Sequence, residues 1–185
     1  MTRVKICGLT READVRAACE AGADAVGFVM VPGTKRAVTP EQVRELVRVV
    51  HPFVLTVGVI QDLALEEAIA LADRSGVRAL QLHGAETPDF AKALKRSRPS
   101  LAVFKAVQLR GSADLAGLSA WSNVDGLLLD SGAGSGRTFD WDWLAGVDWP
   151  AVPRIVAGGL SPENISELLT HLTPEAVDVS SGVEE

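Results

Sequence analysis

Three ionisable side chains lie in or at the ends of short apolar segments, where a parallel sheet would bring them together. Cys7 ends "RVKIC", Asp130 ends "GLLLD", and Asp178 lies within "AVDV". A deprotonated thiol can act as a general base, and a carboxyl group that keeps its proton can act as a general acid. Both residue types also have structural uses, because free cysteine is often buried and aspartate often forms turns. The elements that carry these residues decide between the two interpretations.

Eight short apolar segments, rich in Val, Leu and Ile, alternate with longer amphipathic stretches. Such segments are typical of parallel strands that are buried on both faces. The predicted strands are residues 4–7, 25–29, 55–59, 79–82, 102–106, 126–129, 155–157 and 176–179. They predict an α/β fold, a (β/α)8 TIM barrel, formed by a single domain of residues 1–185. An open doubly wound sheet is the alternative, but its phosphate-binding glycines would follow the first strand.

The segments between the strands carry helix start and stop signals. "TREADVRAACEAG" begins at Thr10 as a cap residue and ends at Gly22. "TPEQVRELVRVV" has Pro40 at the first helical position and Gln42 where a capping box requires it. "TPDFAKALKRS" and "SPENISELLTHL" repeat the opening by a cap residue and proline. The chain stops directly after the eighth strand, so the last helix is missing and we expect the outer faces of strands 8 and 1 to be poorly covered.

Composition and charge limit the partners. The net charge of −6 and the lack of a basic block argue against nucleic acid, which requires a Lys and Arg footprint. No apolar run approaches the ~20 residues of a membrane span, and the N-terminus does not resemble a signal peptide. The two cysteines do not make a disulfide framework, and the three histidines lack metal-ligand spacing. We therefore expect a cytoplasmic protein with no membrane partner and no metal site.

Side chains alternate across a strand, which assigns the ionisable groups to the barrel interior. Lys5 and Cys7 share one face of the first strand, and Cys7 lies nearer the C-terminal rim, the functional end of such barrels. Asp130 ends the sixth strand at the same rim. Because strands 8 and 1 are neighbours in a closed barrel, Asp178 is expected to pair with Lys5. Lys5 is also expected to favour the thiolate of Cys7, whose unperturbed pKa is about 8.5.

Glycine-rich turns follow the last three strands. Gly158 and Gly159 precede a predicted helix, whose exposed N–H groups and dipole favour an anion. "SSGVE" adds Ser181 and Gly182, and "GAGSGRTFDW" contains Gly136. Each turn by itself has an ordinary conformational explanation. Together, at a position where barrels often bind phosphate, they predict a phosphate-binding cradle.

Segments along the whole chain resemble the phosphoribosylanthranilate isomerase family of tryptophan biosynthesis. They are "KICGLT", "GFVMVPGTKRAVTPEQ", "VGVI", "LQLHG", "GLLLDS", "GSGRTFDW", "AGGLSPENI" and "VDVSSGVE", in the family's order. The resemblance implies a (β/α)8 barrel that carries out an Amadori rearrangement. The substrate would be N-(5-phosphoribosyl)anthranilate and the product 1-(2-carboxyphenylamino)-1-deoxyribulose 5-phosphate. It implies no cofactor and a monomer or homodimer that binds a small phosphorylated substrate.

The resemblance also implies roles for single residues. The family's general base matches Cys7, its general acid matches Asp130, and its carboxylate-binding arginine matches Arg36. Its phosphate-binding loops match Gly136, Gly158, Gly159, Ser181 and Gly182. With Asp178, which strand parity places in the barrel interior, the expected substrate-binding residues are Arg36, Gly136, Gly158, Gly159, Asp178, Ser181 and Gly182. The sequence departs from the family at Thr34-Lys35 before Arg36, at Ile60, and in the glycine-rich loop at Ala133 and Ser135.

The implied reaction requires two proton transfers. Asp130 would protonate the furanose ring oxygen while the anilino nitrogen supplies electrons, which requires a carboxyl that partial desolvation or a negative neighbour keeps protonated. The resulting iminium acidifies the C2 hydrogen, which Cys7 would remove. The enolamine then tautomerises to the ketone.

Three other functions are compatible with the sequence. A Schiff-base aldolase would use Lys105 or Lys5. A related sugar-phosphate isomerase of histidine biosynthesis would use paired aspartates, whereas the first strand here offers Cys7. A phosphate-binding barrel without catalytic activity is the third.

Overall fold

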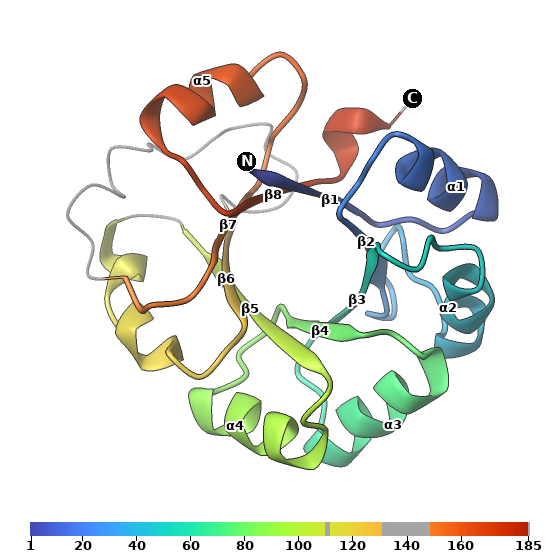
Figure 1. Ribbon diagram of the computed structural model, residues 1–185. Coiled ribbons are helices and arrows are strands. Elements are labelled where there is room, and N and C mark those ends of the chain that lie inside the picture. Colours follow the sequence, from blue (N-terminus) through green and yellow to red (C-terminus); the bar gives the residue numbers. More distant parts are fainter. Residues whose placement is uncertain (110–111, 131–148, 185) are drawn as a thin grey trace.

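Eight parallel strands close into a barrel in the order of the sequence (Figure 1), as the strand pattern predicts. The structure is a computed structural model that describes residues 1–109, 112–130 and 149–184. Closure excludes the open doubly wound sheet, since the first and last strands pair directly. The strands are β1 (Arg3–Cys7), β2 (Ala25–Val29), β3 (Leu55–Ile60), β4 (Ala79–Leu82), β5 (Ala102–Gln108), β6 (Gly126–Asp130), β7 (Arg154–Ala157) and β8 (Ala176–Val179).

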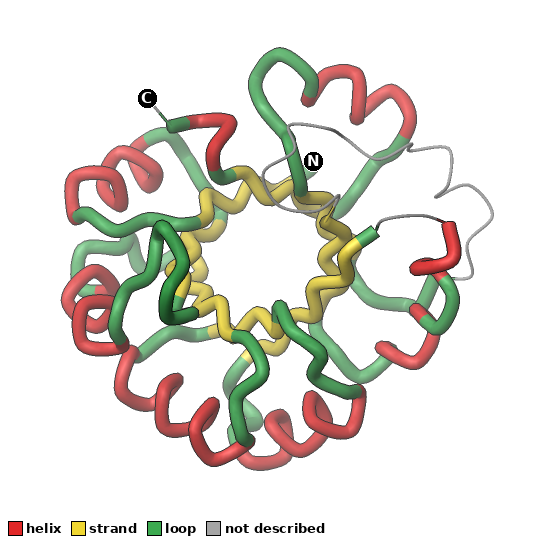
Figure 2. The backbone as a smooth tube through the Cα atoms, turned by 180° about the vertical axis from the view of Figure 1, so that it is seen from behind, coloured by secondary structure: helices red, strands yellow, loops and turns green. Residues whose placement is uncertain are grey.

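Helices surround the ring of strands (Figure 2). The α-helices of the described residues are α1 (Glu12–Glu20), α2 (Pro40–Val47), α3 (Leu65–Ser75), α4 (Pro88–Ser97) and α5 (Ile165–His171). Short 3₁₀ helices are η1 (Ser112–Leu115) and η2 (Leu118–Trp121) between β5 and β6, and η4 (Ser181–Val183) after β8. None of the helices within these described ranges is long and apolar enough to cross a membrane.

The helix ends follow the predicted signals where a side chain can reach the backbone. Thr39 and Gln42 form the capping box of α2, with the Thr39 hydroxyl accepting from the Gln42 N–H at 3.2 Å. The Thr87 hydroxyl caps α4 by accepting from the Phe90 N–H. The C-cap of α3 is Gly76, whose φ of 73° lies in the left-handed region that glycine adopts at little cost.

Two predicted helix starts are wrong. The N-cap of α1 is Arg11 rather than Thr10, and its guanidinium pairs with Asp14 in the first turn of the helix. The helix α5 begins at Ile165, after the predicted Ser161–Pro162 opening. There the Asn164 side chain bonds both the Ser161 N–H and the Gly159 carbonyl, which folds the preceding residues into a separate turn.

The core has an outer and an inner part. Outward side chains of the strands pack against the helices, in one cluster under α1–α4 and in another under α5 and η2. A smaller cluster fills the barrel interior near β5–β8, built from Ala106, Leu128, Ile155 and Ala157. Leu128 therefore points inward and Leu129 outward, so Asp130 has the inward parity that the sequence predicts.

The expectation of poorly covered outer faces on β8 and β1 is correct only for β1. On β1, Val4 is 36% exposed. On β8, Val177 and Val179 are buried because Leu168 of α5 packs in the same cluster. After β8 the described chain forms only η4.

Candidate active site

Strand register brings four residues from four strands into one row. Lys5 on β1 is opposite Asp178 on β8, Asp178 is opposite Ala157 on β7, and Ala157 is opposite Asp130 on β6. Cys7 lies two residues beyond Lys5, at the C-terminal end of β1. Because register partners of parallel strands face the same side, Asp130 lies on the same inner wall as Lys5, and Cys7, which shares the parity of Lys5, faces the same interior from β1, with β7 and β8 between it and β6.

Lys5 and Asp178 form the predicted ion pair inside the barrel. The Lys5 ammonium lies 2.9 and 2.8 Å from the two carboxylate oxygens of Asp178, and both side chains are buried. Burial opposes the charge of Lys5, but attraction to Asp178 and Cys7 outweighs it and raises the lysine pKa above its usual value. Lys5 is therefore a permanent cation beside the Cys7 thiol.

The Cys7 thiol itself is less acidic than the sequence predicts. Its desolvation raises the pKa above the usual value for cysteine, while the nearby Lys5 lowers it and Asp178 raises it. The expected influence of Lys5 is present, but it does not compensate for burial. Cys7 of the free protein therefore forms its thiolate less readily than an unperturbed cysteine.

Asp178→Asn is expected to lower the pKa of Cys7. The substitution removes an anion beside the thiol and leaves the Lys5 cation, which then favours the thiolate more strongly. The rate of iodoacetamide alkylation against pH, measured in a Cys19→Ser background, reports the titration of Cys7. An unchanged or higher midpoint in Asp178→Asn would contradict this electrostatic account.

Gly27 on β2 makes room for the Cys7 sulfur. A Cβ at this position would lie 2.7 Å from the Cys7 Sγ and 3.1 Å from the Lys5 Cε, both closer than normal contacts. Register places Gly27 opposite Cys7, so the sulfur packs directly over the glycine backbone. A glycine inside a strand often marks such a close approach.

Gly27→Ala is expected to reduce kcat by about tenfold or more, since a misplacement of about 1 Å at a reacting group can cost up to about 10²-fold. Its matched control is Gly126→Ala, another interior strand glycine, whose Cβ would crowd Phe104 at 2.9 Å instead of Cys7. Steady-state kinetics on both folded variants checks the prediction. Equal losses of kcat in the two variants would show that crowding in the barrel, not displacement of Cys7, causes the effect.

Asp130 is buried at the end of β6 and faces a histidine. The Nε2 atom of His83 lies 3.6 Å from the Asp130 Oδ2. The Gln81 amide nitrogen lies 2.9 Å from Nδ1 of His83, which holds the ring with its Nε2 toward Asp130. Burial lowers the pKa of His83, which keeps the imidazole neutral at neutral pH.

Lys105 has the structural role that the sequence left open. Its ammonium lies 2.9 Å from the Glu86 carboxylate and 5.3 Å from the centroid of the Trp121 ring. Its neighbours Val103 and Phe104 belong to the outer and inner clusters respectively, so Lys105 shares the outward parity of Val103. This outward position and the ion pair with Glu86 favour a structural role for Lys105 over a role as a Schiff-base lysine.

Arg36 reaches the rim next to Cys7 and holds a carboxylate of its own chain. Its Nε and Nη2 atoms lie 2.5 and 2.7 Å from the two carboxylate oxygens of Glu184. The arginine side chain crosses over Gly8, where any Cβ would collide with it and where φ is 87°. This fork geometry is suited to a carboxylate, the group that the sequence predicts for Arg36.

Two of the three predicted phosphate-binding turns lie together. Gly158 and Gly159 have φ of 89° and 64°, and a Cβ at Gly182 would lie 2.0 Å from the Leu160 carbonyl oxygen. The turn after β7 therefore packs directly on η4, which contains Ser181. Gly136, the third predicted member, lies outside the described residues. The glycines do not immediately precede a helix, because α5 begins only at Ile165.

Some residues of the site cannot be predicted from the sequence, and others can be predicted only in part. His83 lies in "LQLHG", and nothing in the surrounding sequence predicts that its ring faces β6. Glu184 lies near the end of the chain, 148 residues from Arg36, and no pattern connects the two. Gly27 has a usable signal, a glycine within an apolar strand. No group of three or more potential ligands within the described ranges could hold a metal ion.

The closed parallel barrel, with ionisable groups gathered at the C-terminal ends of its strands, places this chain among the (β/α)8-barrel enzymes. The family model for N-(5'-phosphoribosyl)anthranilate (PRA) isomerase matches residues 4–185. The chain belongs to the N-(5'-phosphoribosyl)anthranilate isomerase family.

Individual relatives agree with this assignment. The N-(5'-phosphoribosyl)anthranilate isomerase of Gloeobacter violaceus is 40% identical over 188 residues, which cover 98% of this chain and 84% of that protein. A phosphoribosyl anthranilate isomerase in complex with reduced 1-(o-carboxyphenylamino)-1-deoxyribulose 5-phosphate is 36% identical, with a TM-score of 0.89 over 100% of this chain and 89% of that one. The structure of monomers of the dimeric Thermotoga maritima enzyme is 36% identical, with a TM-score of 0.88 over 100% and 89%.

Proposed function

We propose that this chain converts N-(5-phosphoribosyl)anthranilate into 1-(2-carboxyphenylamino)-1-deoxyribulose 5-phosphate by general acid–base catalysis, as a step of tryptophan biosynthesis. The observation that carries the proposal is the inward placement of Cys7 and Asp130 at the ends of β1 and β6 in a chain of this family. The reduced product in a related structure has the same chemical skeleton as the proposed product.

Asp130 opens the ring in the first step. Its carboxyl donates a proton to the furanose oxygen while the anilino nitrogen forms the iminium. The carboxyl is buried at the end of β6, in the inward row that also contains Asp178. The His83 ring faces this carboxyl, with its Nε2 atom 3.6 Å from the Asp130 Oδ2.

Cys7 removes the C2 proton in the second step. The iminium withdraws electrons from C2, and the Lys5 cation stabilises the thiolate that accepts this proton. The enolamine then becomes the ketone by tautomerisation. Both steps transfer a proton between the substrate and a side chain, and during tautomerisation the C2 hydroxyl returns a proton to Asp130 while C1 takes the proton from Cys7. Both side chains are thereby restored, so the reaction is redox-neutral overall and the mechanism uses no cofactor.

The two ends of the substrate are bound by different parts of the rim. Arg36 holds the anthranilate carboxylate, a role consistent with its bidentate contact to Glu184. The turns with Gly158, Gly159 and Ser181–Gly182 hold the phosphate, together with Gly136. Asp178 acts on the substrate through Lys5, because its carboxylate is already paired with that ammonium.

A fluorescence assay that follows the loss of freshly prepared phosphoribosylanthranilate tests the function. Enzyme-dependent loss of fluorescence, with formation of the carboxyphenylamino ribulose phosphate, is the expected result. No turnover of this substrate by the folded protein would contradict it. Borohydride trapping of a substrate on a lysine would support the aldolase instead, and turnover of the corresponding histidine-pathway aminoaldose would support that isomerase.

A further inference from the structure

Two buried charges behind the site take no part in the proposed chemistry. The Lys105 ammonium and the Glu86 carboxylate lie 2.9 Å apart, with side chains that are only 6% and 2% exposed. A buried ion pair is weak grounds for stability, because two apolar residues of similar volume often stabilise a core as well. The role of this pair is therefore better judged from the hydrogen bonds that it makes with the backbone of the neighbouring loops.

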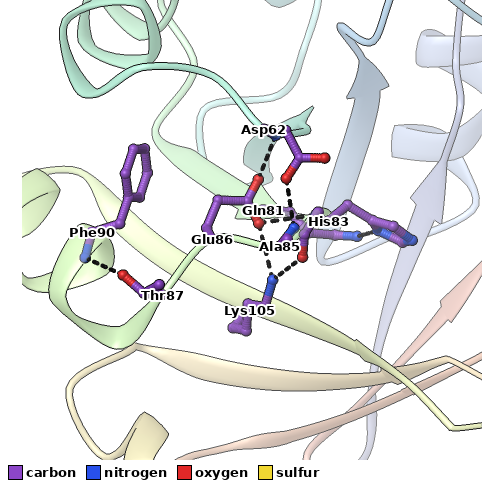
Figure 3. Close-up of polar contacts among 9 residues, drawn as sticks. Asp62, Gln81, His83, Ala85, Glu86, Thr87, Phe90 and Lys105 are labelled. Carbon is purple, nitrogen blue, oxygen red and sulfur yellow. Dashed lines mark hydrogen bonds and ion pairs between the residues drawn. The ribbon is translucent and has the colours of Figure 1, made fainter.

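Glu86 ties the loop after β3 to the loop after β4 (Figure 3). One of its oxygens accepts from the Asp62 N–H and the other from the Gly84 N–H, each at 2.9 Å. The Asp62 carboxylate accepts in return from the Ala85 N–H at 2.6 Å. Lys105 completes the connection by donating to the Gly84 carbonyl at 2.5 Å.

Asp62 adopts a conformation that depends on these contacts. Its φ of 51° lies in the left-handed region, which residues other than glycine seldom occupy. Such backbone persists where the surrounding structure enforces it, and it is common at functional sites. Here the enforcing contacts are the two hydrogen bonds that Asp62 makes to Glu86 and Ala85.

The loop held by these contacts begins at His83. The His83 N–H donates to the Ile60 carbonyl, and the next residue, Gly84, bonds both Glu86 and Lys105. The His83 ring reaches in the opposite direction and faces Asp130 at 3.6 Å. The buried pair is therefore one residue away, along the chain, from the side chain that contacts the proposed acid.

We propose that Lys105 and Glu86, together with Asp62, are positioning residues that hold the His83 ring against Asp130. The inference rests on the proposed function for its catalytic consequence. Loss of the loop contacts lets residues 83–85 shift, so that the His83 ring no longer orients the Asp130 carboxyl and the ring-opening step slows.

The double variant Glu86→Leu with Lys105→Met tests the proposal without leaving an unpaired buried charge. We expect it to stay folded and to lose about tenfold in kcat, because loosened positioning slows the chemical step. KM is expected to change by less than about threefold, since Arg36 and the phosphate-binding turns lie on other loops. Leu94→Ala, which opens a cavity under α4, is the matched control, with lowered thermal stability and unchanged kcat.

Asp62 supplies a second pair of variants that leaves every buried charge in place. Asn and Gly both tolerate the left-handed backbone, but only Asn keeps an acceptor for the Ala85 N–H. We expect Asp62→Asn to keep most of kcat and Asp62→Gly to lose severalfold. If the double variant does not fold, the comparison of Asp62→Asn with Asp62→Gly tests the proposal instead.

The His83 ring gives a readout that does not depend on activity. The charged groups that act electrostatically on the ring are Asp130 from β6, Lys5 from β1, Asp178 from β8 and Lys105 from β5, and all of them are unchanged in Asp62→Gly. NMR titration of the ring should show a pKa closer to the ordinary value in Asp62→Gly, because the ring gains water. Wild-type titration and wild-type kcat in both Asp62→Gly and the double variant would overturn the proposal. If the wild-type protein lacks isomerase activity, the proposed function fails. The NMR titration of His83 then decides by itself whether Asp62, Glu86 and Lys105 hold the His83 ring in place.

Discussion

Replacing Asp130 by Asn is expected to lower kcat by at least about 10²-fold, the scale of a lost general acid. Asn has nearly the same shape, so the buried position at the end of β6 stays filled. Its amide cannot release a proton to the ring oxygen, however, and the furanose then has to open without an acid. The fluorescence assay at neutral pH measures the loss, and circular dichroism checks that the barrel is intact.

The control for Asp130→Asn is Asp73→Asn on the exterior of the barrel. Asp73 lies on α3 and pairs with Arg98 at the surface, where such pairs contribute little. Its kcat should equal that of the wild type. Full activity in Asp130→Asn would place the ring-opening acid elsewhere in the molecule.

Replacing Cys7 by Ser is the other large expected effect, again about 10²-fold or more in kcat. The hydroxyl fits beside Gly27, but it does not ionise near neutral pH even with the Lys5 cation next to it. It therefore cannot take the C2 proton that the thiolate accepts. The same assay measures the loss, with Cys19→Ser on α1 as a control that is expected to keep wild-type kcat.

The pH profile tests the role of Cys7 in a second way. Desolvation raises the pKa of this thiol, so the thiolate fraction of the free enzyme increases as pH rises above neutrality. The base-dependent limb of kcat/KM should therefore rise toward alkaline pH in the wild type and disappear in Cys7→Ser. Near-normal turnover or an unchanged limb in the variant would remove Cys7 from the mechanism.

The sequence by itself determined the barrel and the direction in which the key side chains point. Strand alternation depends only on near neighbours along the chain, so the parity of Cys7 with Lys5 and of Asp130 with Leu128 could be predicted. The capping box at Thr39 and the glycine end of α3 are local for the same reason. The Lys5–Asp178 pair was also predictable, but only once closure of the barrel was assumed, because 173 residues separate the two in the chain.

The tertiary structure alone decided the environment of each side chain. Burial reverses the expected acidity of Cys7, and packing of distant loops places His83 at Asp130, Glu184 at Arg36, and the Leu160 carbonyl against Gly182. The starts of α1 and α5 differ from prediction because the Arg11 side chain pairs with Asp14 in the first turn of α1 and the Asn164 side chain bonds the turn before α5. These properties arise from desolvation and from contacts between segments far apart in the chain. No local pattern encodes either of them, which is why the sequence can name the reacting groups but cannot give their protonation or their neighbours.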